Sequence, residues 1–413
     1  MTENTTVSVE LSIDIGTHNV VGVMAQIYPD EGPFLEIIKV SSRPSRGIKR
    51  GIITNIVPIT NIVQDMIDEF EREENVNVWS VSTSISGAHI RSRNNNGVVT
   101  ISGERFTEKD QARISLEAGK LKLDVGERVL HVLPQKYIVD GGPPVENALG
   151  LAGVKFTLMS HLVTAATNEM ANITNCITTD RSTKVDNIIY EGIASAIAVL
   201  SEDEKQRGIT VIDIGAGVTD VVVYQSGVVV YHESMPFGGD DVTADIAKVK
   251  RFSTQVAESI KIEYGSCVGY TSFDDTFTLP VITNQTESRT MSRRELTSII
   301  EARYREIFEF VRMKIEEAGV FQPHDAGIVL TGGGSMIAGC GDLVQDIMEK
   351  HCRLGIPLNH VKGGGEGLTP AHAAAIGLLA ARVDKTIWQK EIQKTMPKGN
   401  FFSKIYKKIT ENF

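Results

Sequence analysis

The sequence has little that is typical of nucleic-acid-binding or secreted proteins. Its 52 acidic residues outnumber its 42 basic ones and give a net charge of −10, so it lacks the overall basic surface that nucleic-acid phosphates require. Its four cysteines are Cys176, Cys267, Cys340 and Cys352, and no two form a CxxC pair. This spacing favours neither a zinc site nor a disulfide framework. We therefore expect a cytoplasmic protein that binds no nucleic acid.

Long apolar runs are also missing. The beginning, MTENTTVSVE, has neither the basic region nor the apolar stretch of a signal peptide. The best apolar run, residues 371–381, is too short to span a bilayer. A chain of 413 residues normally divides into two or more domains. If this protein contacts a membrane, we expect it to lie on the surface.

Two stretches far apart in the chain repeat each other. They are LSIDIGTHNVVGVMAQ from Leu11 and ITVIDIGAGVTDVVVYQSG from Ile209. In each, an apolar strand leads into Asp-Ile-Gly, turns and continues as a second apolar strand, which predicts a β-hairpin. Between them, strands such as VDNIIY alternate with helices, for example near residues 61–73 and after Gly192. We predict two similar α/β domains that face each other.

Two segments interrupt this alternation. Residues 86–165 contain the run GVVTIS and the turn-rich stretch DGGPPVENALG, and they predict an inserted small subdomain. Residues 231–299 form a second excursion, which carries the polar loop TNQTESRTMSRRE.

The Asp-Ile-Gly turns contain the residue types that a nucleotide phosphate needs. Three glycines permit close approach of backbone N–H groups to phosphate oxygens: Gly16, Gly215 and Gly217. Thr17 adds a hydroxyl donor, and Asp14 and Asp213 are expected at the bottom of the cleft, where carboxylates can hold the water shell of Mg²⁺. One such turn alone is an ordinary tight turn. Two copies that face each other predict a two-jawed phosphate clamp.

Two further segments are candidates for binding a nucleoside. In IVLTGGGSMIAG, residues 328–339, three glycines after a strand leave a bare peptide surface for a purine, with a helix expected from Ser335 or Met336. In isolation this is an ordinary glycine-rich loop. In QVAESIKIEYG, Glu258 and Lys261 share one helical face. Glu258 can accept from ribose hydroxyls while the lysine stem covers the base; the alternative is a surface ion pair.

The last residues, FFSKIYKKITENF at 401–413, predict an amphipathic helix. Helical projection separates an apolar arc from lysines on the opposite side, and residues 385–400 before it are typical of a polar tether. We expect a membrane-binding or partner-binding segment; the alternative is the apolar edge of a helix docked on its own domain. The residues expected at a membrane are Phe401, Phe402, Lys404, Ile405, Tyr406, Lys407, Lys408, Ile409 and Phe413.

The two hairpins, the TGGG loop and the AExIK-type helix together resemble the actin, Hsp70 and sugar-kinase superfamily of ATP-binding proteins. Within it, the chain resembles the FtsA family of bacterial division proteins from end to end, through SRGIKRG at 45–51, SGAHI at 86–90, HVLPQKY at 131–137 and HLVTA at 161–165. Two positions depart from the family pattern. Asn147-Ala148 stands in place of Asn-Pro, and Asp-Ile-Gly-Ala-Gly stands in place of Asp-Ile-Gly-Gly-Gly. The methyl group of Ala216 argues against a backbone with positive φ at this phosphate turn.

The resemblance implies an actin-like two-domain α/β fold with an ATP cleft, an FtsA-type inserted subdomain 1C and a C-terminal amphipathic helix. The expected divisions are subdomain 1A at 1–85, 166–204 and 371–384; 1C at 86–165; 2A at 205–230 and 300–370; 2B at 231–299; a linker at 385–400; and the membrane-targeting helix at 401–413.

The resemblance also implies a function. Family members bind ATP, form filaments on the inner face of the cytoplasmic membrane at the division site, bind the C-terminal tail of FtsZ through 2B and contact later division proteins through 1C. The expected ligands are ATP and a Mg²⁺ ion held through water by Asp14 and Asp213. The expected nucleotide-binding residues are Asp14, Gly16, Thr17, His18, Asn19, Asp213, Gly215, Ala216, Gly217, Val218, Gly239, Glu258, Lys261, Gly332, Gly333, Gly334 and Ser335. The alternative is a small-molecule kinase of the same superfamily, which would have no use for a lipid-binding segment.

Catalytic and partner residues are less distinct in the sequence. Glu191 occupies the place where relatives in the wider superfamily have a water-orienting carboxylate; the alternative is an acid favoured by the helix dipole. Slow or negligible ATP hydrolysis is compatible with either. Arg293 and Arg294 are candidates for pairing with an acidic FtsZ tail. Alternatively, Ser292 and Glu295 form a capping box and these arginines face solvent.

Overall fold

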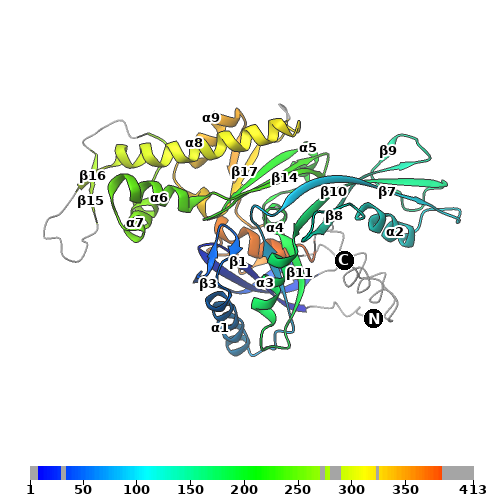
Figure 1. Ribbon diagram of the computed structural model, residues 1–413, viewed down its shortest axis with the longest axis horizontal. Coiled ribbons are helices and arrows are strands. Elements are labelled where there is room, and N and C mark those ends of the chain that lie inside the picture. Colours follow the sequence, from blue (N-terminus) through cyan, green and yellow to red (C-terminus); the bar gives the residue numbers. More distant parts are fainter. Residues whose placement is uncertain (1–7, 29–33, 270–274, 280–289, 322–324, 384–413) are drawn as a thin grey trace.

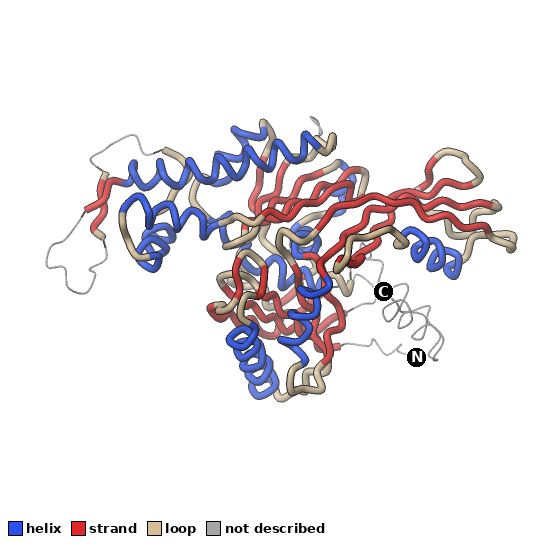
Figure 2. Tube along the Cα trace, in the orientation of Figure 1, coloured by secondary structure: helices blue, strands red, loops and turns tan. Residues whose placement is uncertain are grey.

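The computed structural model describes residues 8–28, 34–269, 275–279, 290–321 and 325–383. Two sheets that share a five-strand arrangement form the body of the molecule, the first with β19 as an additional edge strand, and a third sheet projects to one side (Figures 1 and 2). On the other side, the helices α6 to α8 lead away from the body toward a small two-stranded ribbon (Figure 1).

The first sheet has the strand order β11-β6-β1-β2-β3-β19. Its central strand β1 pairs antiparallel with β2 and parallel with β6. The strands are β1 (Ser8–Ile15), β2 (Asn19–Tyr28), β3 (Phe34–Pro44), β6 (Ser80–Ile85), β11 (Lys184–Tyr190) and β19 (Val361–Gly363). A separate short hairpin follows β3 and consists of β4 (Ile48–Lys49) and β5 (Ile52–Ile53).

The second sheet repeats this arrangement in the order β14-β13-β12-β17-β18. Its strand β12 pairs antiparallel with β13 and parallel with β17, as β1 does with β2 and β6. The strands are β12 (Ile209–Ile214), β13 (Thr219–Gln225), β14 (Val228–Met235), β17 (Ile328–Thr331) and β18 (Cys352–Leu354). Both predicted hairpins and the predicted duplication are therefore confirmed.

The third sheet has the order β7-β10-β8-β9 and lies within the stretch predicted as an insertion. Its elements are β7 (Arg91–Thr100), α2 (Glu108–Ala118), β8 (Glu127–Val139), β9 (Pro144–Val145) and β10 (Lys155–Ala166). It has a core of its own, in which the rings of Phe106 and Phe156 stack at 4.4 Å between centroids. The exact subdomain boundaries stay predictions.

Five of the described helices belong to the first half of the molecule; four of them contact the first sheet, and the short helix at residues 202–207 contacts β13 of the second sheet. The five are α1 (Ile56–Glu74), α3 (Thr167–Thr178), α4 (Glu191–Val199), α5 (Glu202–Arg207) and α10 (Ala373–Ala380), with the 3₁₀ turn η2 (Pro370–His372) before α10. Helix α1 begins earlier than the predicted residue 61. The reason is that the Asn55 side chain accepts from the Val57 N–H as an N-cap, and Pro58 is tolerated in a first helical turn.

The helices of the second half are α6 (Gly239–Lys250), α7 (Thr254–Tyr264), α8 (Arg293–Glu317) and α9 (Cys340–Met348), with the 3₁₀ turn η1 (Gly333–Met336). The ribbon consists of β15 (Thr276–Thr278) and β16 (Thr290–Ser292). Helix α8 runs without a break across the boundary expected between residues 299 and 300. The prediction of an α-helix from Ser335 or Met336 is wrong, because a 3₁₀ turn occupies residues 333–336 and α9 begins only at Cys340.

The predicted membrane segment, residues 401–413, and the tether at 385–400 lie outside the described residues. Among the helices that are described, none is both long enough and apolar enough to cross a bilayer.

Candidate nucleotide-binding site

The two Asp-Ile-Gly turns have the same hydrogen-bonded closure. After β1, the Gly16 N–H donates to the Asn19 carbonyl over 3.0 Å; after β12, the Gly215 N–H donates to the Val218 carbonyl over 2.8 Å. Between them in the first turn, His18 is exposed. The repeat in sequence therefore produces a repeat in local geometry.

The two turns are in close contact. A Cβ added to Gly217 would lie 2.9 Å from the Thr17 side chain, closer than real Cβ atoms approach. Thr17 in turn accepts a hydrogen bond from the Gly51 N–H over 3.1 Å. The absence of a side chain at Gly217 lets the hairpins meet, so the predicted facing of the two jaws is confirmed as geometry, while phosphate binding stays a prediction.

Ala216 is accommodated in the second turn without strain. It is not among the described non-glycine residues with positive φ, which agrees with the prediction that an alanine argues against a positive-φ backbone at this position. Its carbonyl accepts from the Asp240 N–H over 2.7 Å, and the Gly215 carbonyl accepts from the Gly239 N–H over 3.0 Å. These bonds join the beginning of α6 to the second turn and place Gly239 beside it.

Two carboxyl groups form the floor beneath the turns. Asp14 and Asp213 are 6% and 4% exposed, and each accepts a hydrogen bond, from the Ser84 and Ser195 hydroxyls respectively. Burial raises the pKa of Asp14 to about 6 and that of Asp213 to about 7. Neutral pH therefore leaves these groups close to their titration range, where a nearby cation would favour the charged form.

Two more carboxyl groups complete this floor. Asp220 lies opposite Asp213 in the β12–β13 register and accepts from the Ser86 hydroxyl over 2.6 Å; burial raises its pKa to about 6. Glu191 is the first residue of α4, and burial together with repulsion from the aspartates raises its pKa well above the ordinary value. For Glu191, desolvation and repulsion thus outweigh the helix dipole.

Sequence reasoning missed Asp220 and the serines that bond to the floor. Asp220 had a usable signal: in a hairpin closed after DIGAG, the residue opposite Asp213 is fixed by the tight turn. The first hairpin has Val21 at the matching position opposite Asp14, so the two copies differ there. The serines come from other strands and helices, and no local pattern marks them.

The acidic floor is compatible with a hydrated cation. Among the described residues, no cluster of three or more histidine, cysteine or carboxylate side chains is arranged to ligate a metal ion directly. Asp14 and Asp213 are nevertheless buried carboxyl groups with raised pKa values, and oxygen donors of this kind suit a Mg²⁺ ion that keeps its waters. The water-mediated Mg²⁺ site stays a prediction.

The TGGG loop lies directly against the second hairpin. Gly332 has φ of +81°, and a Cβ there would lie 2.1 Å from an Asp213 carboxyl oxygen, so only glycine fits. At Gly333, by contrast, the nearest atom to an added Cβ is the Ala371 methyl at 3.7 Å. The Ser335 hydroxyl turns back and donates to the Gly332 carbonyl over 2.7 Å. The Gly334 carbonyl accepts a hydrogen bond from the Tyr304 hydroxyl of α8 over 2.6 Å, which fixes the loop to that helix.

Glu258 and Lys261 of α7 form a partly buried pair rather than a surface one. Their charged groups lie 2.7 Å apart, and the side chains are 21% and 9% exposed. The Lys261 ammonium also donates to the Gly239 carbonyl over 3.0 Å and to the Thr243 hydroxyl over 2.9 Å. The pair therefore joins α7 to the beginning of α6 at the second turn.

The partner-binding candidates Arg293 and Arg294 are the first two residues of α8. Helix α8 does begin after Ser292, but Ser292 makes no side-chain capping bond, so the capping-box alternative is wrong. Arg293 pairs with Asp275 at 3.2 Å and lies over the rings of Tyr264 and Phe277 at 5.2 and 5.6 Å. Arg294 is exposed on the same helical turn. Their partner role stays a prediction.

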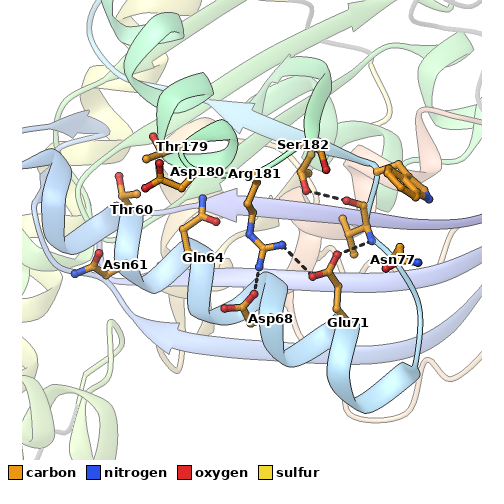
Figure 3. A pocket seen from close by; sticks show the side chains of 13 residues that line it. Thr60, Asn61, Gln64, Asp68, Glu71, Asn77, Thr179, Asp180, Arg181 and Ser182 are labelled. Carbon is orange, nitrogen blue, oxygen red and sulfur yellow. Dashed lines mark hydrogen bonds and ion pairs between the residues drawn. The ribbon is translucent and has the colours of Figure 1, made fainter.

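Figure 3 shows a separate polar cavity of about 640 Å³, whose lining includes no residue of the hairpin turns. It is formed by α1, by residues 77–79 before β6 and by residues 179–183 before β11. Arg181 points across it and contacts Asp68 and Glu71, the latter at 2.9 Å (Figure 3). The positive charge of Arg181 in this cavity is thus neutralised by the carboxylates of Asp68 and Glu71.

Comparison with known proteins shows the family. A model of cell division protein FtsA matches residues 210–377, and a model of the SHS2 domain inserted in FtsA matches residues 87–164. The chain is 35% identical over 377 residues to cell division protein FtsA of Pseudomonas aeruginosa, covering 91% of this chain and 89% of that protein. It is 30% identical over 404 residues to the FtsA of Borreliella burgdorferi, covering 97% and 96%.

Solved structures show the same fold at low sequence identity. The PilM–PilN type IV pilus biogenesis complex matches with a TM-score of 0.65 and 17% identity, covering 91% of this chain and 98% of that one. MreB5 of Spiroplasma citri bound to ADP matches with a TM-score of 0.55 and 15% identity, covering 95% and 99%. The fold is therefore actin-like, as predicted, and the chain belongs to the FtsA family of cell division proteins.

Proposed function

We propose that this protein is an ATP-binding, actin-like scaffold of bacterial cell division that polymerises on the inner face of the cytoplasmic membrane at the division site. In this proposal, its C-terminal segment anchors the FtsZ ring to the membrane. The region of α6 to α8 binds the FtsZ tail, and the third sheet contacts later division proteins. The observation that carries the proposal is the pair of facing hairpins over buried carboxyl groups, in a chain of the FtsA family.

Different residues of the predicted site have different roles in nucleotide binding. The first glycine of each turn uses its N–H to close that turn, which leaves the N–H groups of Thr17 and Gly217 for phosphate oxygens. Asp14 and Asp213 would hold the waters of a Mg²⁺ ion, which would neutralise phosphate charge. The open surface at Gly333 receives the purine, and Glu258 accepts from the ribose. Glu191 has the position of a water-orienting carboxyl, and we expect hydrolysis to be slow at most.

The C-terminal segment supplies the membrane contact in this proposal. Each of its large apolar side chains contributes roughly 1.5–3 kcal/mol when fully buried, and each lysine near an anionic leaflet adds about 1 kcal/mol. Because ordering the segment offsets much of this, a single segment binds weakly. Polymers that carry many segments bind tightly through effective concentration.

Co-sedimentation with anionic vesicles tests the proposal. We expect the full chain to pellet with vesicles, more strongly with Mg-ATP than without, and a chain ending at Gly399 to stay in solution. The double variant Phe402→Glu with Ile409→Glu should stay in solution while it retains ATP binding. Its matched control, Ser403→Glu with Thr410→Glu, adds the same charge outside the apolar arc and should still pellet. If the full chain does not pellet with vesicles in any condition, the proposed membrane role is wrong.

A further inference from the structure

The SRGIKRG segment contains a strained turn that the predicted nucleotide site does not include. Arg50 and Gly51 connect β4 to β5, with φ of 51° and 75°. Two successive residues with positive φ are typical of a tight hairpin turn that favours asparagine or glycine at its first position. Arginine in the left-handed region is unfavourable there. A strained backbone that persists at a site is a reason to look for a function of that side chain.

The tip of this turn packs against both phosphate hairpins. The Gly51 N–H donates to the Thr17 hydroxyl of the first hairpin over 3.1 Å. A Cβ added to Gly51 would lie 3.1 Å from a Val218 methyl of the second hairpin, and one added to Gly217 would lie 3.0 Å from the Arg50 Cα. The Arg50–Gly51 turn therefore contacts both hairpins and forms a third side of the predicted nucleotide site.

The Arg50 guanidinium reaches from this turn to the beginning of α6. Its Nη2 lies 2.8 Å from Oδ1 of Asp241, and the other Asp241 oxygen accepts from the Gly238 N–H over 3.0 Å. Asp241 is thus fixed at the helix end, whereas the Arg50 side chain is 49% exposed. An exposed ion pair of this kind contributes little free energy, so a stronger anion can displace the carboxylate.

The turns where phosphate is expected carry no lysine or arginine, and Lys261, which lies beside Gly239, is already paired with Glu258. The floor beneath the hairpins consists of four carboxyl groups: Asp14, Asp213, Asp220 and Glu191. The turns themselves contribute glycines, Thr17, His18 and Ala216, without a lysine or arginine. A polyphosphate placed there meets nearby negative charge, and the planar fork of a guanidinium matches phosphate oxygens in geometry and charge.

We propose that Arg50 binds the terminal phosphate of a nucleoside triphosphate, and that its ion pair with Asp241 is the resting position of the same side chain. This inference rests on the proposed function of the cleft as an ATP site and adds a residue that distinguishes triphosphate from diphosphate. When Arg50 moves from Asp241 to the phosphate, the contact between the β4–β5 hairpin and α6 is exchanged for a contact through the nucleotide. Whether the β4–β5 hairpin contacts α6 directly or through the nucleotide would then depend on the presence of the third phosphate.

Titration calorimetry with Mg-ATP and Mg-ADP tests this assignment on the full chain. The variant Arg50→Asn removes the charge and keeps the turn, because asparagine tolerates the left-handed region. We expect it to weaken Mg-ATP binding by about tenfold or more, from loss of a charge-assisted hydrogen bond, and to change Mg-ADP binding by less than about twofold. Asp241→Asn releases Arg50 and should tighten Mg-ATP binding by about two- to fivefold.

The control is Lys49→Gln, an exposed neighbour in the same hairpin whose charge is also removed. It should leave both affinities unchanged. If Arg50→Asn leaves Mg-ATP binding intact, or weakens Mg-ATP and Mg-ADP equally, the assignment of Arg50 is wrong while the ATP site stands. If the unmodified chain binds neither nucleotide, the proposed ATP site is wrong and this inference is overturned with it.

Discussion

Two buried clusters of titratable side chains meet at Tyr190, and burial acts on them in opposite directions. On one side lie the carboxyl groups of the cleft floor, whose pKa values rise, to about 7 for Asp213. On the other side lie three histidines whose pKa values fall, to about 3 for His131 and about 4 for His161. The Tyr190 N–H donates to Nε2 of His131 over 3.1 Å, which links the second cluster to the last residue of β11, directly before Glu191. In both clusters, desolvation favours the neutral form.

The histidine cluster joins the third sheet to the second. Nε2 of His161 in β10 lies 2.7 Å from Nδ1 of His232 in β14, and Nδ1 of His161 lies 2.8 Å from the Asn94 side-chain oxygen in β7. Both imidazoles are fully buried. This cluster is a closed contact between parts of the protein, whereas the acidic floor faces the turns where a ligand is expected. Burial in the histidine cluster thus accompanies a contact between two parts of the protein, whereas burial in the acidic floor lies at the predicted ligand site.

The two clusters have opposite effects on how the stability of the folded protein changes with pH. Asp213 has a folded pKa above its ordinary value of 3.8, so the folded state holds more protons between about pH 4 and 7, and stability falls as pH rises through that window. His161 has a folded pKa below its ordinary value of 6.5. The unfolded state then binds more protons between about pH 4 and 6.5, and stability falls as pH drops. Single variants separate these effects.

The largest effect is expected from breaking the histidine contact. His161→Ala leaves a cavity and removes the partner of His232 and of Asn94, so it should lower the free energy of unfolding by about 2–4 kcal/mol. Urea unfolding at neutral pH, followed by circular dichroism, measures this. The control is His351→Ala at an exposed position, which should stay within about 0.5 kcal/mol. Equal small losses in both variants would mean that the buried contact contributes nothing.

A smaller effect of opposite sign is expected from the acidic floor. Asp213→Asn removes a group whose ionisation destabilises the folded state, so the variant should gain about 2 kcal/mol relative to the unmodified protein between about pH 5 and pH 7.5. Urea unfolding of the nucleotide-free protein at both pH values measures the difference. Asp346→Asn changes an exposed aspartate of α9 and should show no such pH dependence. A pH-independent difference for Asp213→Asn would place its folded pKa near the ordinary value.

The smallest effect is expected from the hydroxyl that supports Asp213. The fully buried Ser195 donates to the Asp213 carboxyl, so Ser195→Ala should cost about 1 kcal/mol above about pH 7, where the carboxylate is charged, and less near pH 5. Ser298→Ala is a matched helical control, since Ser298 is exposed and donates only to a backbone carbonyl. A loss that is the same at both pH values would show that the hydroxyl does not act through the charge of Asp213.

Much of the fold was predictable because its signals are local. Alternating apolar residues on either side of Asp-Ile-Gly predict a hairpin wherever they occur, and two such hairpins were sufficient to predict the duplicated domains. The start of α1 was missed because a capping asparagine precedes a proline that is easily taken for a helix stop. The start of α9 was misplaced because the glycines at 332–334 form a 3₁₀ turn first.

The sequence by itself determined the duplicated hairpins, the glycine turns and the family, since these depend on residues close together in the chain. Only the tertiary structure decided which distant side chains meet. It brought together His131, His161 and His232, and it carried Arg50 across to Asp241. The physical reason is that a hairpin pattern is set by side-chain alternation along one strand, whereas contacts between sheets depend on how whole elements pack.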